Sequence, residues 1–252
     1  MDAASFKRSI RDLQVWCSSC MVAFSGSDPI GVLIGAKRPS GTLVHKIAVH
    51  PDHRRQGHGR HLLASLGSKL AILGPPRIVA EVPESLAPAC ELFSASGYVQ
   101  EALLTDYVFQ REQEDSDMRE GFVIPVTVDD LAANGLIGEA DRQVCWERSV
   151  ETLTARDDDI AGLAVASDER IEAYLLYVKS GMEETEIVSL RSFIDDGGAR
   201  LKQLLSRLRA LGIETFRFPK VHPAEISKEL VANLGFSPVR GHLLYAATAR
   251  SA

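Results

Sequence analysis

A pattern of residues recurs at one fixed offset along the two halves of this 252-residue chain. Glu91-Leu92 followed by Gly97-Tyr98 returns as Glu229-Leu230 followed by Gly235-Phe236, an offset of 138 residues. The same offset carries Gly59 onto Gly197, and one helically spaced set of leucines onto another: Leu63, Leu66, Leu70 and Leu73 onto Leu201, Leu204, Leu208 and Leu211. Because one offset serves a loop glycine, a helix and a distal helix end, the sequence indicates an internal duplication.

The length of the chain favours two domains of ordinary size. Between the repeats lies the stretch QREQEDSDMREG at 110–121, which is densely charged and has no apolar periodicity. The sequence therefore predicts an N-terminal domain at 1–110, a linker at 111–121 and a second domain at 122–252.

Apolar periodicity predicts an α+β fold in each half, with a mixed, mostly antiparallel sheet flanked by helices. In the second half we expect strands at 122–127, 160–167, 170–178, 186–191, 215–219 and 241–248. We expect helices at 129–141 (capped by Asp129 or Asp130) and at 150–156, a long helix that ends near residue 211, and a last helix that ends near residue 234. In the first half we expect strands at 20–25, 30–37, 43–49, 77–82 and 105–110, and helices at 57–73 and 86–96. Shifted back by 138 residues, the opening strand would precede Met1, so the first half is expected to lack its front strand.

Composition excludes several classes of partner. A net charge of −6 and a pI near 5.7 leave no basic footprint for nucleic acid. The N-terminal segment has no apolar core like that of a secretory signal, and no apolar run approaches membrane-spanning length. The four cysteines lack the paired spacing of a metal site. We expect a cytoplasmic protein with no membrane partner, no nucleic-acid partner and no metal.

The stretch Val44 to Leu63 runs from a strand through a basic, glycine-punctuated turn into a helix. Gly57 and Gly59 have no side chains, so the backbone amides from Gln56 to Arg60 can close on an anion at the helix N-terminus. Arginine side chains and the helix dipole add positive potential there. These features together match the demands of a pyrophosphate.

The turn Arg54-Arg55-Gln56-Gly57-His58-Gly59 resembles motif A of the GNAT N-acetyltransferases, which reads Q/R-x-x-G-x-G/A. The resemblance extends to Tyr98 and implies acetyl-coenzyme A as acyl donor and a small-molecule or peptide amine as acceptor. In that family the pantetheine arm lies along the strand before the loop, like an added strand. The implied donor site comprises Ile47, Ala48, Val49, Arg54, Arg55, Gln56, Gly57, His58, Gly59 and Arg60.

Attack by an amine on the thioester needs a base, and His45 is the candidate. Strand alternation would place it on the face of Ile47, and the strand resembles that of arylalkylamine N-acetyltransferases, where a histidine stands here. The alternative is a packed strand histidine. Many family members also carry a tyrosine as general acid, but its position here holds Phe93, which cannot donate a proton.

In the second repeat the matching loop reads Ser192-Phe-Ile-Asp-Asp-Gly197, whose aspartates would repel a pyrophosphate. We therefore expect a degenerate copy that has lost the donor, and that shapes the acceptor pocket, completes the sheet or mediates a homodimer. The leading hypothesis is an acetyltransferase. Its alternatives are a non-catalytic acyl-coenzyme A sensor and a purely structural interaction protein.

Overall fold

The computed structural model describes residues 3–109, 122–138, 144–178, 184–213 and 215–249. The chain divides into two compact units. Unit 1 comprises residues 1–103 and 241–252, and unit 2 comprises residues 104–240.

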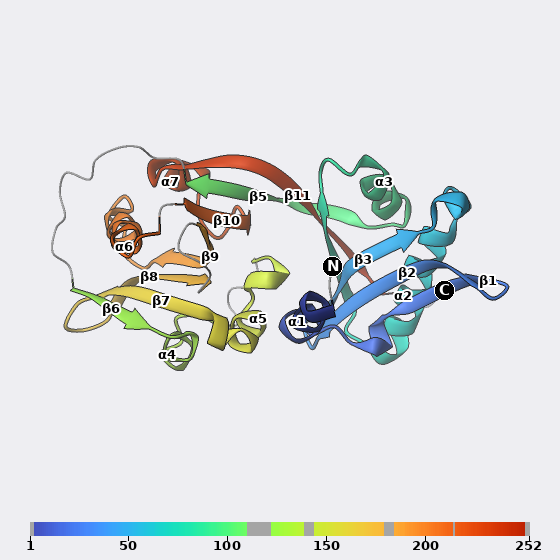
Figure 1. The fold of residues 1–252 in the computed structure, drawn as a ribbon, viewed down its shortest axis with the longest axis horizontal. Coiled ribbons are helices and arrows are strands. Elements are labelled where there is room, and N and C mark those ends of the chain that lie inside the picture. Colours follow the sequence, from blue (N-terminus) through green and yellow to red (C-terminus); the bar gives the residue numbers. More distant parts are fainter. Residues whose placement is uncertain (1–2, 110–121, 139–143, 179–183, 214, 250–252) are drawn as a thin grey trace. The chain divides into compact units, whose positions relative to one another are not determined.

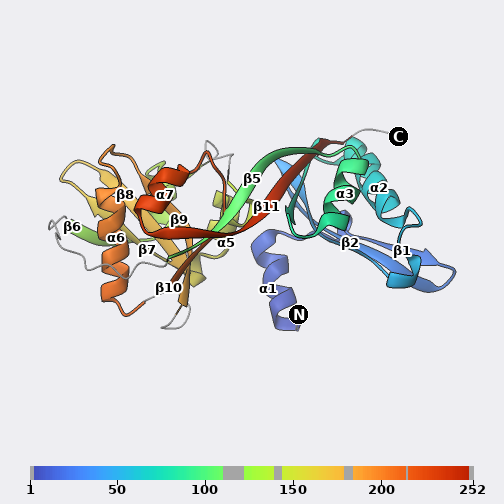
Figure 2. The same cartoon turned by 90° about the horizontal axis from the view of Figure 1, so that it is seen from above.

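Unit 1 is a sheet with helices on both of its faces (Figure 1). Its strands follow the order β1 (Met21–Ser25), β2 (Asp28–Arg38), β3 (Gly41–Val49), β4 (Arg77–Pro83) and the end of β11 (Phe236–Thr248). All neighbours are antiparallel except β3 and β4, which the crossover helix α2 (His58–Leu73) joins. Figure 2 shows α2 and α3 (Ala87–Ala95) on the opposite side of the strands from α1 (Ala3–Leu13).

The crossover helix α2 forms because its leucines recur every three or four residues and share one face. Leu62, Leu63, Leu66 and Leu70 are buried against the sheet, where Leu33 and Val44 belong to the same core. The helix begins after Gly57 and ends before Gly74, as the sequence predicted. Burial of this leucine face fixes the first turn of α2 beside the end of β3.

Unit 2 is also a sheet, with helices on both faces. Its strands follow the order β5 (Val99–Phe109, its end), β10 (Thr215–Val221), β9 (Glu184–Ser192), β8 (Ile171–Val178), β7 (Ile160–Ala166) and β6 (Phe122–Val126). The leucines of α6 (Ala199–Ala210) and the apolar residues of α7 (Lys228–Asn233) build the core on one face. The short helices α4 (Val128–Ala133) and α5 (Val150–Ala155) bury the other face.

The duplication inferred from the sequence is visible in the order of elements. An offset of 138 residues carries β4 (77–83) onto β10 (215–221) residue for residue, and α2 and β5 onto the ranges of α6 and β11. The α+β fold class with two similar units is confirmed. Among the described residues, the sheet of unit 1 ends at β1 and has no strand that corresponds to β6.

The units do not divide at residues 110–121. Beside β4 lies β11, with Tyr245 paired to Ala80, and beside β10 lies β5, with Tyr107 paired to Phe218. Each repeat thus supplies the last strand of the other repeat's sheet, so the expected ranges 1–110 and 122–252 differ from the units at residues 104–110 and 241–252. The expected linker at 111–121 lies outside the described residues.

Several element ends also differ from the sequence prediction. Helix α4 is short, and its N-cap is Thr127, whose side chain accepts from the Asp130 amide while Asp130 accepts from the Thr127 amide. Neither aspartate is therefore the cap itself. Strands β5 and β11 begin earlier than expected because each runs on through polar positions. None of the helices in the described ranges is long and apolar enough to cross a bilayer.

Candidate functional site

The loop between β3 and α2 folds back on itself. The Arg54 side chain donates from Nε to the carbonyl of Val49 (3.1 Å), and the Gln56 side chain donates to the carbonyl of Asp52 (3.1 Å). Gly57 has φ 87°, a left-handed conformation that suits glycine, and an added Cβ would meet no atom within 4 Å. A turn of this kind leaves open space in front of the helix N-terminus.

The first turn of α2 presents backbone amides to that space. The first helical hydrogen bond runs from the His61 amide to the Gly57 carbonyl (3.0 Å), so the amides of residues 58–60 have no acceptor within the helix. At Gly59 an added Cβ would lie 3.1 Å from the Leu92 side chain of α3, which explains the second glycine of the motif. These amides and the helix dipole would suit an anion.

The edge of β3 that faces β4 is largely open. The two parallel strands pair only at Thr42 with Ile78 and at Leu43 with Val79 within the described residues. On the other edge, the His50 amide donates to Ile30 of β2, and alternate residues of a strand direct their backbone groups to opposite edges. Ile47 and Val49 therefore direct theirs toward the opening, whereas Ala48 directs its groups to β2.

Positive charge gathers around the opening and the loop. Arg54 lies at the mouth through its bond to Val49, and Arg55 pairs with Glu91 of α3 (3.2 Å), with both side chains mostly exposed. The rings of His50, His53 and His58 contact one another in sequence along the loop. The surface pair of Arg55 contributes little energy and leaves its guanidinium available to a stronger anion.

Strand β3 is irregular at His45, the base predicted from the sequence. Lys46 pairs with Ile34 but Val44 pairs with Gly35, so one extra residue, His45, bulges from β3. Val44 and Ile47 consequently pack against the same core, which unbroken alternation would forbid. His45 is half-buried at the bulge, a distortion that re-aims side chains and is frequent beside active sites.

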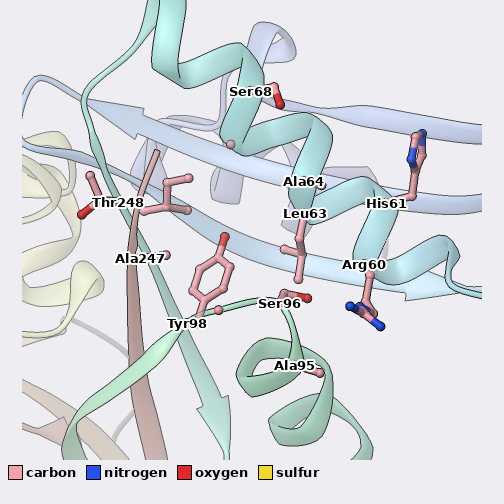
Figure 3. A pocket seen from close by; sticks show the side chains of 13 residues that line it. Arg60, His61, Leu63, Ala64, Ser68, Ala95, Ser96, Tyr98, Ala247 and Thr248 are labelled. Atoms are coloured by element: carbon pink, nitrogen blue, oxygen red, sulfur yellow. The ribbon is translucent and has the colours of Figure 1, made fainter. Parts of the chain in front are cut away.

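A cavity of about 570 Å³ lies beside α2 in unit 1 (Figure 3). Its walls come from α2, the turn after α3, β4 and β11: Arg60, His61, Leu63, Ala64, Gly67, Ser68, Ile78, Ala95, Ser96, Gly97, Tyr98, Ala247 and Thr248. Tyr98 itself is 7% exposed and packs edge-on against Phe93, so it is a core residue. In the part of the chain that the structure describes, its hydroxyl has no hydrogen-bond partner, and burial raises the pKa of Tyr98.

In the corresponding loop of unit 2, a carboxylate of the chain itself accepts hydrogen bonds from the amides at the helix N-terminus. Helix α6 also begins after a left-handed glycine, Gly198, but the Asp196 carboxylate accepts from the amides of Gly198 (3.0 Å) and Arg200 (3.1 Å). The Arg200 guanidinium also donates to Asp196 (2.8 Å). An anion held within the chain thus stands where unit 1 offers free amides.

The strand opening of unit 2 is likewise filled by the chain. Within the described ranges, β9 and β10 pair over three residues each and no further than Glu186 with Arg217. The strands β3 and β4 of unit 1 likewise pair over only part of their length. Beyond that point the segment η3 (Trp146–Arg148) contacts β9, and Arg148 donates to the carbonyls of Pro219 and Lys220 in β10. Arg148 is buried, pairs with Glu225 and lies over the Phe218 ring, so its charge is fully engaged.

The carboxylate cap gives a prediction for Asp196→Ala. Burial by itself would raise the pKa of Asp196, but the hydrogen bonds from Arg200 and Gly198 outweigh it and lower the pKa. The wild type should therefore exceed the variant by about 1 kcal/mol in unfolding free energy above pH 5, and lose that advantage as pH falls through the lowered pKa. Urea unfolding at pH 7 and pH 3 measures it, with Asp195→Ala as the exposed control.

An equal difference at both pH values would mean that charge is not what stabilises the turn. Loss of stability in the Asp195→Ala control would point to the loop backbone instead.

The structure gives three residues of these sites roles that the sequence did not predict. The sequence indicated only a repulsive charge at Asp196, whereas this residue caps α6. Neither the buried pairing of Arg148 nor the stacking of Tyr245 on Phe93 was expected. Arg148 and Tyr245 each contact a partner that lies far away in the sequence. Within the described ranges, no three His, Cys, Asp or Glu side chains are grouped to hold a metal.

Comparison with known protein families gives a match over residues 3–98. This segment matches the model of the acetyltransferase (GNAT) family. A search of curated protein sequences found no match. The matched segment runs from α1 to Tyr98 and includes the β3 edge and the glycine loop.

Solved structures resemble almost the whole chain. A tandem GNAT protein from the clavulanic acid biosynthesis pathway is 18% identical, with a TM-score of 0.64 over 96% of this chain and 87% of that chain. A GCN5-related N-acetyltransferase from Sphaerobacter thermophilus is 14% identical (TM-score 0.68; 97% and 85% covered). One from Anabaena variabilis is 10% identical (TM-score 0.71; 99% and 67% covered). Both units therefore share the fold of these proteins.

Proposed function

We propose that this chain, whose residues 3–98 match the model of the acetyltransferase (GNAT) family, transfers the acetyl group of acetyl-coenzyme A to an amine. The observation that carries the proposal is the meeting of two features at the end of β3. The open edge offers the backbone groups of Ile47 and Val49, and the adjoining α2 N-terminus offers free amides. An extended arm that ends in a pyrophosphate needs both in this order.

The residues divide the work of holding the donor. Ile47 and the Val49 amide bind the pantetheine arm as an added strand, since the Val49 carbonyl is engaged by Arg54. The amides from Gln56 to Arg60 bind the pyrophosphate, with the arginines adding charge. A backbone amide near Val49 also stabilises the negative charge that develops on the thioester oxygen during attack.

His45 serves as the general base in this proposal. The amine must be neutral when it attacks, so a proton leaves its nitrogen for the imidazole, directly or through water. The bulge places His45 between the paired part of β3 and the open edge that binds the arm. This position at the head of the opening supports the role.

Unit 2 binds no coenzyme A in this proposal and is a degenerate copy. Its helix N-terminus already holds the Asp196 carboxylate, and its strand opening already holds Arg148. The residue at its β9 bulge is Val188, which has no proton to exchange. We expect one donor site per chain.

A turnover assay tests the proposed reaction against simple binding. The net charge of −6 favours cationic acceptors, so the panel should span polyamines, aminoglycosides, arylalkylamines and peptide amines. Release of free thiol from acetyl-coenzyme A, sustained over many turnovers with one amine, is the expected result. Binding of the donor without release with any amine would favour the non-catalytic acyl-coenzyme A sensor.

A further inference from the structure

Transfer of the acetyl group leaves a thiolate that is better expelled as a thiol. A donor to the sulfur accelerates this step, typically by about 10²- to 10⁴-fold. Phe93 cannot supply the proton, so the sequence leaves the donor unassigned. The role of such a proton donor rests on the proposed acetyl transfer.

Tyr245 lies at the head of the opening between β3 and β4. On β11 it pairs with Ala80 of β4, one residue beyond the last pair between the two strands, Leu43 with Val79. Its side chain belongs to the same core as Val44, on the face that α2 and α3 cover. This position on the sheet is level with the start of the opening, where the proposal puts the thioester end of an arm that runs along β3.

The ring of Tyr245 is held in place by α3. It stacks on Phe93, with ring centroids 5.8 Å apart and planes 18° apart. The hydroxyl lies 3.5 Å from the Ser94 hydroxyl, so it has a polar neighbour through which a proton can pass. The phenol therefore lies directly beside the ring that occupies the position of the missing acid.

Two of the tyrosines, Tyr98 and Tyr245, belong to the unit that contains the opening. Of the five in the chain, Tyr107, Tyr174 and Tyr177 belong to unit 2. Tyr98 is in unit 1, but its hydroxyl has no hydrogen-bond partner among the described residues, whereas the Tyr245 hydroxyl accepts from Ser94. Tyr245 alone among them combines a place in unit 1 with a hydroxyl neighbour.

We propose that Tyr245 donates the proton to the sulfur of coenzyme A as the acetyl group departs. The carbon–sulfur bond breaks, its electron pair stays on sulfur, and the Tyr245 proton completes the thiol. The amine nitrogen, which has formed the new bond to the acetyl carbon, loses its proton to His45. A proton from solvent, relayed by Ser94, then restores the phenol.

Tyr245→Phe in the full chain tests this role, with Tyr98→Phe as the matched control from the same aromatic cluster. Thiol release is followed with acetyl-coenzyme A and an amine from the panel, and coenzyme A affinity by calorimetry. We expect kcat of Tyr245→Phe to fall by about 100-fold or more, and the alkaline limb of its pH profile to disappear. The coenzyme A affinity of this variant should stay within about twofold of the wild-type value. A merely structural role of Tyr245 would not combine an unchanged affinity with an altered pH profile. Tyr98→Phe should keep its kcat.

The outcomes separate this inference from the proposed function. If the wild type turns over and Tyr245→Phe keeps kcat within about threefold, Tyr245 is not the donor while acetyl transfer stands. If both tyrosine variants lose kcat and coenzyme A affinity alike, the cluster is only structural and the inference is overturned. If the wild type binds acetyl-coenzyme A but releases no thiol with any amine, both the function and the inference fail.

Discussion

His45→Gln is expected to lower kcat by about 10²- to 10⁴-fold, the usual contribution of a positioned base. Glutamine keeps the size and hydrogen-bonding capacity of the side chain at the β3 bulge but cannot take a proton. Steady-state rates from pH 5 to 9 measure the effect, and the acidic limb of the wild-type profile should vanish. Coenzyme A affinity should change little because the base does not hold the donor.

His222→Gln, in unit 2, is the control for a histidine outside the site and should keep wild-type kcat. Near-native kcat of His45→Gln between pH 6 and 8 would show that His45 is a packed strand residue, and that water or another group accepts the proton.

Gly57→Glu should weaken coenzyme A binding by about 100-fold or more. At φ 87° a residue with a side chain has a backbone strain of roughly 1–2 kcal/mol, so glutamate would distort the turn. The new carboxylate would also stand before the amides of α2 and repel the pyrophosphate. Calorimetric titration of the variant with coenzyme A measures the loss.

Gly26→Glu supplies a matched control for backbone strain. Gly26 also has positive φ (61°), and an added Cβ there would meet nothing within 4 Å, but it lies in the turn between β1 and β2. Both variants should lose some stability, and only Gly57→Glu should lose affinity. Equal affinities in the two variants would remove the glycine loop from the donor site.

Local pattern was enough to predict most elements of the fold. The leucine spacing of α2 and the glycines around it fixed that helix to within a residue, since the apolar face and the turn chemistry are local properties. Because the sequence repeats, the position of an element in one half predicted its position in the other, as for β4 and β10. The function proposed for the glycine loop depends on backbone groups, whose arrangement is also a local property.

Pairings between distant residues were beyond the sequence. The last strands of the two repeats, β5 and β11, have similar residue patterns, and each pattern is compatible with either sheet. The local sequence therefore did not show that β11 pairs with β4. The bulge at His45 arises from its register with β2, which alternation along one strand cannot reveal. For the same reason the stacking of Tyr245 on Phe93, between residues far apart in the chain, could be found only in the structure.

The number of coenzyme A molecules bound per chain tests the central claim most directly. Calorimetric titration of the wild-type chain should give one site, because unit 1 offers an open strand edge and free helix amides while Asp196 and Arg148 fill both places in unit 2. Two equivalent sites, or none, would contradict this account.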